Sequence, residues 1–177
     1  MRFIRQLFNS VKKTSFDKQV ENILGLKPTN IALYTAALSH RSVKESPDEN
    51  NERLEYLGDA VLSGIVADYL FKRYPYKGEG FLTEMRSKIV SRENLKHLAF
   101  KLGINHFIKK THGPDSFRNI YGDALEALIG AVYLDKGYKK TQKWVEKYII
   151  STHMFIDDLE TIEINIKNKL YGWANKN

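Results

Sequence analysis

Apolar residues recur at a spacing close to the helical repeat along almost the whole chain, and this periodicity constrains the fold more than any other feature. The two-residue turn signals that mark β-hairpins are missing. The pattern predicts helices over residues 2–13, 16–24, 29–38, 49–74, 82–101, 117–136 and 138–153, with a short one over 166–175. We therefore expect an all-α fold.

Composition limits the kinds of site that such a fold can carry. The chain has no cysteine, which excludes a disulfide scaffold, a thiol nucleophile, an iron–sulfur cluster and a cysteine-type zinc site. Lysine and arginine outnumber the acids by 28 to 21, a formal net charge of +7. This excess predicts a polyanionic partner, with nucleic acid first and an acidic membrane surface second. No apolar run approaches the roughly 20 residues that span a bilayer, so we expect a soluble protein. We further expect a cytoplasmic location, no membrane partner and no small-molecule cofactor.

The first predicted helix, residues 2–13, has two interpretations. It is basic, lacks acids and is amphipathic. A transit peptide or a membrane-surface helix has this pattern. An amphipathic helix packed on the core has it as well, and we favour that interpretation.

Three acids share one face of the helix predicted over residues 49–74. At about 100° per residue, Glu52, Glu55 and Asp59 fall within roughly 60° of one another, and Leu54 and Ile65 fall on the opposite face. Like charges stacked in this way repel and destabilise the helix. A divalent cation would offset that repulsion.

The helix predicted over residues 117–136 repeats the arrangement with Asp123 and Glu126. Its other residues are almost wholly apolar, so we expect a central helix with two carboxylates at an inner wall. Buried carboxylates need a metal or a basic partner. An oxygen-only site of this kind suits Mg²⁺, with Mn²⁺ as a substitute, and does not suit zinc. The alternative is that the acids form salt bridges with Arg53, Arg86 or Arg118.

Four stretches of the sequence resemble the ribonuclease III family. NERLEYLGDAVL at residues 51–62 is similar to the family's signature motif, and YGDALEALIGAVYLD at 121–135 resembles its second acidic motif. LYTAALSHRS at 33–42 and the Gly78-Glu79-Gly80 turn also match, in the family's order. The resemblance implies an all-α catalytic domain over residues 1–158 that forms a homodimer and cuts double-stranded RNA by two-metal-ion catalysis. It further implies 5′-phosphate and 3′-hydroxyl ends and a role in processing rRNA and mRNA precursors.

The resemblance also assigns roles to individual acids. It makes Glu55, Asp123 and Glu126 metal ligands, with Glu126 also catalytic, and gives Asp59 a catalytic role in holding a water on the metal. Glu52 and Glu79 would serve a second metal and the substrate. Because all six acids are present, the pattern indicates an active enzyme. The rival hypothesis is a non-catalytic RNA-binding or ribosome-associated module, which we would expect to lack some of them.

The chain departs from the family pattern at two places. Tyr56 stands where the family usually has phenylalanine, an aromatic that the resemblance places at the dimer interface. A tyrosine there needs a hydrogen-bond partner for its hydroxyl or an exit to water. The second departure is at residues 159–177, which resemble a connector and short helix leading toward a double-stranded RNA-binding domain that is absent from this sequence.

Basic residues supply candidate contacts to RNA phosphates. Duplex RNA is recognised mainly through its shape, phosphates and 2′-hydroxyls, so we expect little base specificity. His40 is interpreted as a packed, hydrogen-bonded histidine and not as a catalytic base. The candidate RNA contacts are Arg86, Lys88, Arg92, Lys109, Lys110 and Arg118.

Overall fold

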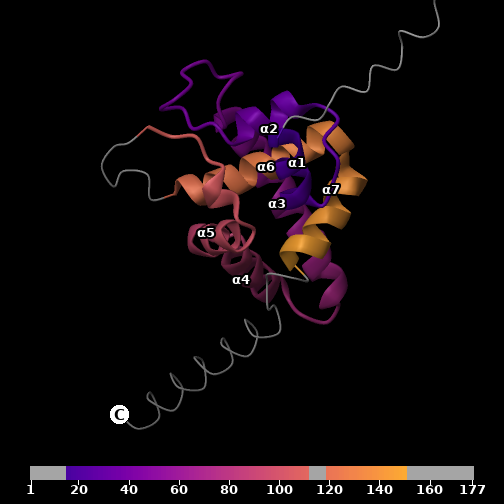
Figure 1. Ribbon diagram of the computed structural model, residues 1–177. Coiled ribbons are helices and arrows are strands. Elements are labelled where there is room, and N and C mark those ends of the chain that lie inside the picture. Colours follow the sequence, from indigo (N-terminus) through magenta and orange to yellow (C-terminus); the bar gives the residue numbers. More distant parts are fainter. Residues whose placement is uncertain (1–14, 112–118, 151–177) are drawn as a thin grey trace, which may run out of the picture.

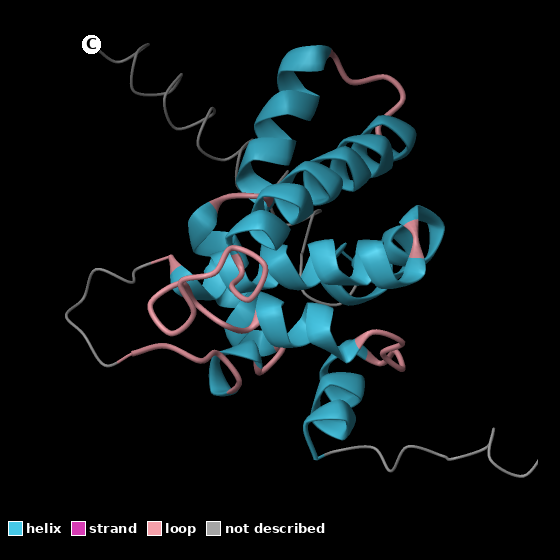
Figure 2. Ribbon diagram, turned by 90° about the horizontal axis from the view of Figure 1, so that it is seen from above, coloured by secondary structure: helices cyan, strands magenta, loops and turns pink. Residues whose placement is uncertain are grey.

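The computed structural model describes residues 15–111 and 119–150 (Figure 1). Its helices are α1 (Ser15–Leu24), α2 (Ile31–Ala37), α3 (Glu52–Arg73), α4 (Glu79–Ile89), α5 (Arg92–Lys101), α6 (Ile120–Lys136) and α7 (Tyr138–Val145), with a 3₁₀ turn at Ile104–His106 and a π-helical turn at Glu146–Ile150. Within the described residues there is no β-strand, and the one β-bridge joins Ser39 to Lys109 (Figure 2). The all-α prediction is confirmed.

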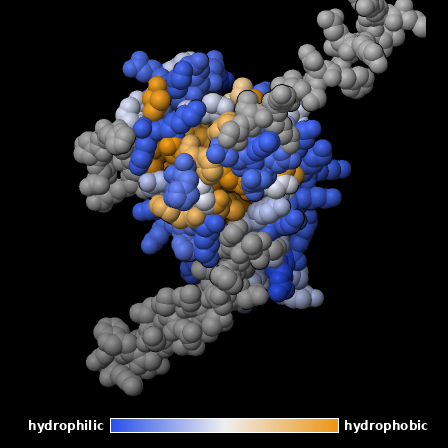
Figure 3. All heavy atoms as spheres, viewed as in Figure 1, coloured by the Kyte–Doolittle hydropathy of each residue, from blue (hydrophilic) through white to orange (hydrophobic). Residues whose placement is uncertain are grey.

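Helix α6 lies at the centre of the molecule, as the sequence predicted. Helices α2, α3, α5 and α7 all pack against it (Figure 1). Side chains on several of its faces, including Ala124, Leu125, Leu128 and Ile129, are no more than 1% exposed. On the face shown in Figure 3, hydrophobic residues gather in the middle and hydrophilic residues surround them. No helix in the described part of the chain is long and apolar enough to cross a membrane.

Helices α3 and α6 touch through their backbones, because each contributes a glycine where they cross. A Cβ atom added to Gly58 would lie 1.7 Å from the carbonyl oxygen of Glu126. A Cβ atom added to Gly130 would lie 2.3 Å from the carbonyl oxygen of Leu54. Any side chain at either position would therefore push the two helices apart. Since Glu55 and Asp59 flank Gly58 in α3, this contact sets them beside Glu126.

Helix α2 is anchored at its N-terminus by Asp135, near the end of α6. The Asp135 carboxylate accepts hydrogen bonds from the backbone N–H groups of Thr29 at 2.9 Å and Asn30 at 3.1 Å, and from the Tyr34 hydroxyl at 2.7 Å. These bonds satisfy donors that would otherwise be unpaired at a helix start. Burial alone would raise the pKa of Asp135, but the hydrogen bonds hold its pKa below the ordinary value.

The segment after α2 runs back across the start of α3 and is tied down on both sides. The backbone N–H of His40 donates to the carbonyl of Lys109 at 2.9 Å, and the N–H of Asn51 donates to the carbonyl of Ser39 at 2.9 Å. Asp135 therefore positions α2, and α2 positions the residues around His40 beside the N-terminus of α3.

The prediction of a single helix over residues 82–101 is wrong. The chain forms α4 from Glu79 to Ile89 and α5 from Arg92 to Lys101. Between them Ser91 is extended, and its hydroxyl caps α5 by accepting a hydrogen bond from the N–H of Asn94 at 3.3 Å. Apolar periodicity continues across this break because both helices bury residues in the same core, so periodicity alone does not reveal it.

Some predicted features fall beyond the part of the chain that the structure describes. They are the helices over residues 2–13 and 166–175, the boundary at residue 158, and Arg118.

Candidate metal centre

The crossing of α3 and α6 brings three carboxylates together. One oxygen of each of Glu55, Asp123 and Glu126 lies within 4.8 Å of the other two. All three side chains are half-buried. The sequence predicted these residues as metal ligands, and the structure brings them to one place, although their role stays a prediction.

The three carboxylates open onto a cavity of about 480 Å³. Asp59 and Glu52 also line this cavity, so five of the six predicted acids meet there. Asp59 is exposed at its edge, and Glu52 lies at the N-terminus of α3.

The electrostatics of this cavity favour a cation. Burial, followed by the charges of Asp59, Glu55 and Asp123, raises the pKa of Glu126 to about 8. Burial and the charges of Asp123 and Glu52 raise the pKa of Glu55 to about 7. Burial also raises the pKa of Asp123. Without a compensating positive charge, the cluster therefore resists full ionisation.

Salt bridges do not supply that positive charge. No ion pair in the described part of the chain involves Glu55, Asp59, Asp123 or Glu126, and the nearby arginines are otherwise engaged or exposed. Arg53 pairs with Asp48, and Arg41 pairs with Glu52 at 3.1 Å. Among the described residues, Glu52 is the acid of this set that forms a salt bridge, and its partner is Arg41 and not Arg53 or Arg86; Arg118, the third predicted partner, lies outside the described residues.

The donors fit a hard divalent cation. The cluster offers carboxylate oxygens and no nitrogen or sulfur, which is the set that Mg²⁺, Mn²⁺ and Ca²⁺ prefer. Burial and, for Glu55 and Glu126, the neighbouring acids raise the pKa values of the cluster, and a bound cation would offset both effects. The cluster can bind a metal.

Among the six predicted acids, Glu79 is the one that the structure does not bring to the cluster. It is exposed at the first position of α4, where its carboxylate accepts a hydrogen bond from the Thr83 hydroxyl at 2.8 Å. It lines neither of the two cavities that border the carboxylates.

Tyr56 projects from α3 beside the cluster and lines the same cavity. Its side chain is 83% exposed, which is unusual for a large aromatic residue. The hydroxyl therefore reaches water in a single chain.

The predicted basic contacts lie at different distances from the carboxylates. Arg92, in the first turn of α5, lines the metal cavity, and its positive charge lowers the pKa values of the cluster. Lys110 donates a hydrogen bond to the hydroxyl of Tyr121 at 3.3 Å, and Lys109 lies over the ring of Phe16. Lys88 pairs with Glu84 one turn earlier in α4.

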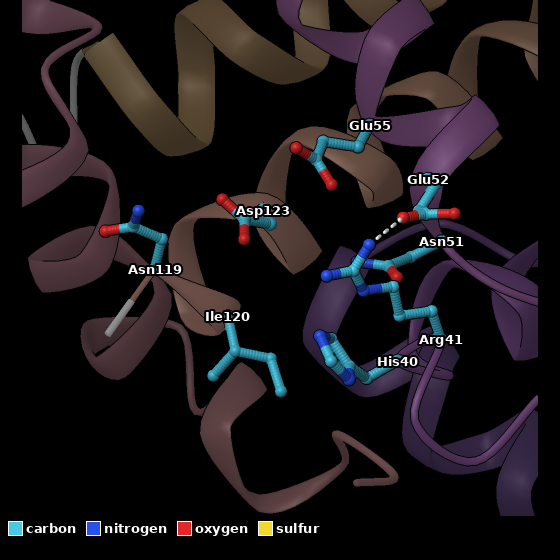
Figure 4. Close-up of a pocket in the computed structure, with 8 residues that line it drawn as sticks. All are labelled: His40, Arg41, Asn51, Glu52, Glu55, Asn119, Ile120 and Asp123. Atoms are coloured by element: carbon cyan, nitrogen blue, oxygen red, sulfur yellow. Dashed lines mark hydrogen bonds and ion pairs between the residues drawn. The ribbon is translucent and has the colours of Figure 1, made fainter. Parts of the chain in front are cut away.

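A second cavity of about 320 Å³ adjoins the carboxylates on the side of the α2–α3 segment (Figure 4). It shares Glu52, Glu55 and Asp123 with the first cavity. Its remaining walls are residues that the sequence did not mark as functional, apart from His40, which was interpreted as packed. They are His40, Arg41, Asn51, Asn119 and Ile120.

His40 is held in one tautomer in this wall. The N–H of Ser42 donates to its Nδ1 at 3.1 Å, so the neutral ring carries its proton on Nε2. Burial and the neighbouring Arg41 lower the pKa of His40. This agrees with the prediction of a packed, hydrogen-bonded histidine.

Residues 30–153 match the model of a family described as ribonuclease-III-like. The match covers well over half of the chain and contains the carboxylate cluster, and so the chain belongs to the ribonuclease-III-like family.

The relatives of the chain agree with this assignment. It is 46% identical over 173 residues to Ribonuclease 3 of Azobacteroides pseudotrichonymphae, covering 96% of this chain and 66% of that protein. It is 45% identical over 160 residues to Ribonuclease 3 of Bacteroides thetaiotaomicron, covering 88% of this chain and 51% of that protein. The chain thus spans less than two thirds of the length of these relatives.

Solved structures give the same answer. The nuclease domain of ribonuclease III from Campylobacter jejuni superposes with a TM-score of 0.70 at 33% identity, over 77% of this chain and 95% of that one. A second structure of that domain, with a TM-score of 0.67 at 34% identity over 74% of this chain and 96% of that one, is described by structural flexibility in a region involved in dimer formation.

Proposed function

We propose that this chain is the nuclease part of a ribonuclease III-type endoribonuclease that hydrolyses double-stranded RNA with divalent cations. The carboxylate cluster carries the proposal, because four half-buried or exposed acids from two crossing helices converge and none of them forms an ion pair with another described residue. The family resemblance and the Ribonuclease 3 relatives support it. The same resemblance extends the proposal to rRNA and mRNA precursors as substrates.

Glu55, Asp123 and Glu126 would hold the cation, with Asp59 and Glu52 at the border of the same cavity. Bound Mg²⁺, or Mn²⁺ in its place, would activate the attacking water and stabilise negative charge on the leaving oxygen. The chain needs no side-chain nucleophile for this reaction. Water adds to phosphorus, the bond to the 3′ oxygen breaks and that oxygen gains a proton, which leaves a 5′-phosphate and a 3′-hydroxyl.

The rest of the cavity suits an anionic strand. Arg92 stands at its border and offers a positive charge to a phosphate. The whole chain carries a net charge of +7, and excluding the six predicted acids leaves 28 basic against 15 acidic residues, a charge of +13 for the rest of the chain. Lysines and arginines around the cavity would thus attract the duplex.

We also propose a homodimer with Tyr56 at its interface. One cluster cuts one strand, so a duplex needs two clusters related by a two-fold axis. The exposure of Tyr56 beside the cluster supports this, as does the dimer-forming region described for the Campylobacter jejuni domain.

Replacing Glu126 with glutamine tests the activity. Glutamine has the same shape but no charge, so it is a poor ligand for a hard cation. We expect the Glu126→Gln variant to keep its fold and its affinity for duplex RNA but to cut roughly a thousandfold more slowly, a loss of about 4 kcal/mol of transition-state stabilisation. The assay is cleavage of a long RNA duplex with and without Mg²⁺.

Glu45→Gln is the matched control, because Glu45 is exposed and lies outside both cavities. It should cut at the wild-type rate. Wild-type cutting by Glu126→Gln would contradict the assignment, and a wild-type chain that binds the duplex without cutting it at any Mg²⁺ concentration would favour the non-catalytic alternative.

A further inference from the structure

The second cavity has unused hydrogen-bonding groups at the starts of two helices. Asn51 is the N-cap residue of α3 and Asn119 is the N-cap residue of α6, and both line this cavity (Figure 4). Asparagine at an N-cap usually accepts a hydrogen bond from the first helical turn through its side chain. Neither residue does so here.

The capping role at α3 is taken by the preceding residue. The side-chain oxygen of Asn50 accepts a hydrogen bond from the N–H of Glu52 at 3.1 Å. Asn51 is therefore released from capping, although it stands at the position where capping is expected.

Asn51 is also unsatisfied. It is 3% exposed, and its side-chain oxygen has no hydrogen-bond partner in the structure. A buried acceptor without a partner destabilises a protein. A donor that reaches this oxygen from the cavity would relieve that cost.

The opposite side of the cavity carries a positive charge that is weakly held. Arg41 pairs with Glu52 at 3.1 Å, and the two side chains are 69% and 50% exposed. An ion pair this exposed contributes little to stability, because solvent screens both charges. A phosphate, which accepts two parallel hydrogen bonds from a guanidinium group, can therefore replace the Glu52 carboxylate. The positive ends of α3 and α6 at the same cavity favour an anion further.

We propose that this cavity is a ribose–phosphate subsite, in which the asparagine side chains accept a hydrogen bond from a ribose 2′-hydroxyl and Arg41 binds the adjoining phosphate. This proposal rests on the proposed function, and it names the part of the RNA substrate that the second cavity recognises. Because it shares Glu55 and Asp123 with the metal cavity, it holds the nucleotide next to the cleaved bond. DNA has no 2′-hydroxyl, so the subsite selects RNA at the cutting position.

Removing the hydroxyl and the asparagine together tests the contact. The substrate is a short RNA hairpin whose cut site has been mapped with the wild-type chain, made as a series with a single 2′-deoxynucleotide at each position around the cut. Affinity is measured by competition in EDTA, and the single-turnover rate is measured in Mg²⁺. We expect one position at which the deoxynucleotide weakens wild-type binding about fivefold to tenfold. In the Asn51→Ala variant the same deoxynucleotide should change binding less than twofold, because the two changes remove one contact.

Asn119→Ala provides a second variant, since Asn119 is half-buried and its removal disturbs no cap. Thermal unfolding of each variant establishes that it is folded before binding is compared. Equal penalties from the deoxynucleotide in the wild type and in both variants would overturn the 2′-hydroxyl contact.

Arg41→Gln tests the phosphate contact, with Arg53→Gln as its control. Arg53 is also an exposed arginine in an ion pair, but it lines neither of the two cavities that border the carboxylates. We expect Arg41→Gln to reduce the slope of log affinity against log salt by about one, and Arg53→Gln to leave it unchanged. Equal slopes for the two variants would overturn the role of Arg41. A wild-type chain that does not bind the hairpin would overturn the proposed function itself. If the wild type binds and cuts the hairpin, and the variants show the same deoxynucleotide penalty and the same salt slope as the wild type, the subsite alone is overturned.

Discussion

Asp135 shows how one buried charge far from the cavity positions residues that line it. Its carboxylate accepts three hydrogen bonds at the start of α2 and pairs with Lys136, and its side chain is 2% exposed. Hydrogen bonds to a charged group contribute about 1.5–3 kcal/mol each. The consequence reaches the segment after α2, which carries His40 and Arg41 in the wall of the second cavity.

We expect Asp135→Asn to lower the free energy of unfolding at pH 7 by about 2–3 kcal/mol. The asparagine amide keeps one accepting oxygen, but its NH₂ group would face N–H or O–H donors that the second carboxylate oxygen now satisfies. The folded-state pKa of Asp135 is lowered, so its stabilisation is present above the ordinary pKa of 3.8 and is lost as pH falls through the folded-state value. Urea unfolding at pH 7 and pH 3 checks both points. A difference between wild type and variant that stays constant between these pH values would contradict the ionic role.

Among individual residues, the sequence predicted those whose chemistry is unusual for their position. Acids at one helix face are costly without a cation, and so the two helical sets that contain Glu55, Asp123 and Glu126 could be recognised from their spacing, whereas the choice of these three as ligands came from the family resemblance. Asn51 and Asn119 could not, because asparagine at the start of a helix is ordinary. Only the structure shows that Asn50 caps α3 and that the side chain of Asn51 is left unpaired.

At the scale of elements, the contact between α3 and α6 determines the site. We expect Gly58→Ala to lower the free energy of unfolding by about 3 kcal/mol or more, because its Cβ would meet the backbone at Glu126 at 1.7 Å and backbone atoms cannot rotate away. The widened crossing should also abolish stabilisation by Mg²⁺. Chemical denaturation with and without Mg²⁺ measures both effects.

Gly64→Ala is the control for this change, because Gly64 lies in the same helix and an added Cβ there meets nothing within 4 Å. Alanine in an open helical position should stabilise the protein by about 0.5–1 kcal/mol. If both variants behave alike, the close crossing does not limit stability.

The elements themselves were predictable where amphipathic periodicity and burial agree, as in α6. They were not predictable where a break leaves the periodicity intact. Helix α4 ends at Ile89 and Ser91 caps α5, within a run that buries Met85, Ile89 and Leu95 in the same core. The close approach at Gly58 and Gly130 was also hidden, since it depends on which faces of two distant helices meet.

At the scale of the whole molecule, Tyr56 tests whether two copies associate. We expect the wild-type chain to be a dimer at micromolar concentration and Tyr56→Ala to weaken it by about 2–4 kcal/mol, if this aromatic residue is a buried anchor of the interface. Light scattering over a concentration series measures this. Tyr56→Phe should keep the dimer, because the aromatic ring is retained. Tyr76→Ala is the control for exposure: Tyr76 is 98% exposed, and its replacement should leave the dimer unchanged. A monomeric wild type would contradict the proposed dimer.

The charge of the molecule makes a separate prediction about salt. If the five described candidate cations, Arg86, Lys88, Arg92, Lys109 and Lys110, all contact phosphates, the slope of log affinity against log salt is about −4 to −5. Duplex binding and cutting at about 50 mM salt should then be largely lost at about 200 mM. Fluorescence anisotropy across this range gives the slope. Binding that is independent of salt would exclude electrostatic capture as the main source of affinity.

The backbone contact between α3 and α6 has a consequence for the choice of ion. Mg²⁺ and Ca²⁺ differ in size, with oxygen ligands at about 2.0–2.1 Å and 2.3–2.6 Å, and Mg²⁺ tolerates less variation in its coordination. Side chains in most cores can repack around a change, whereas two glycine backbones in contact leave no room for the helices to approach and nothing flexible between them. The carboxylates beside Gly58 and Gly130 are therefore carried by a frame of fixed width. We therefore expect this fixed width, which two residues without side chains set, to limit how far the carboxylates can adjust to the larger cation.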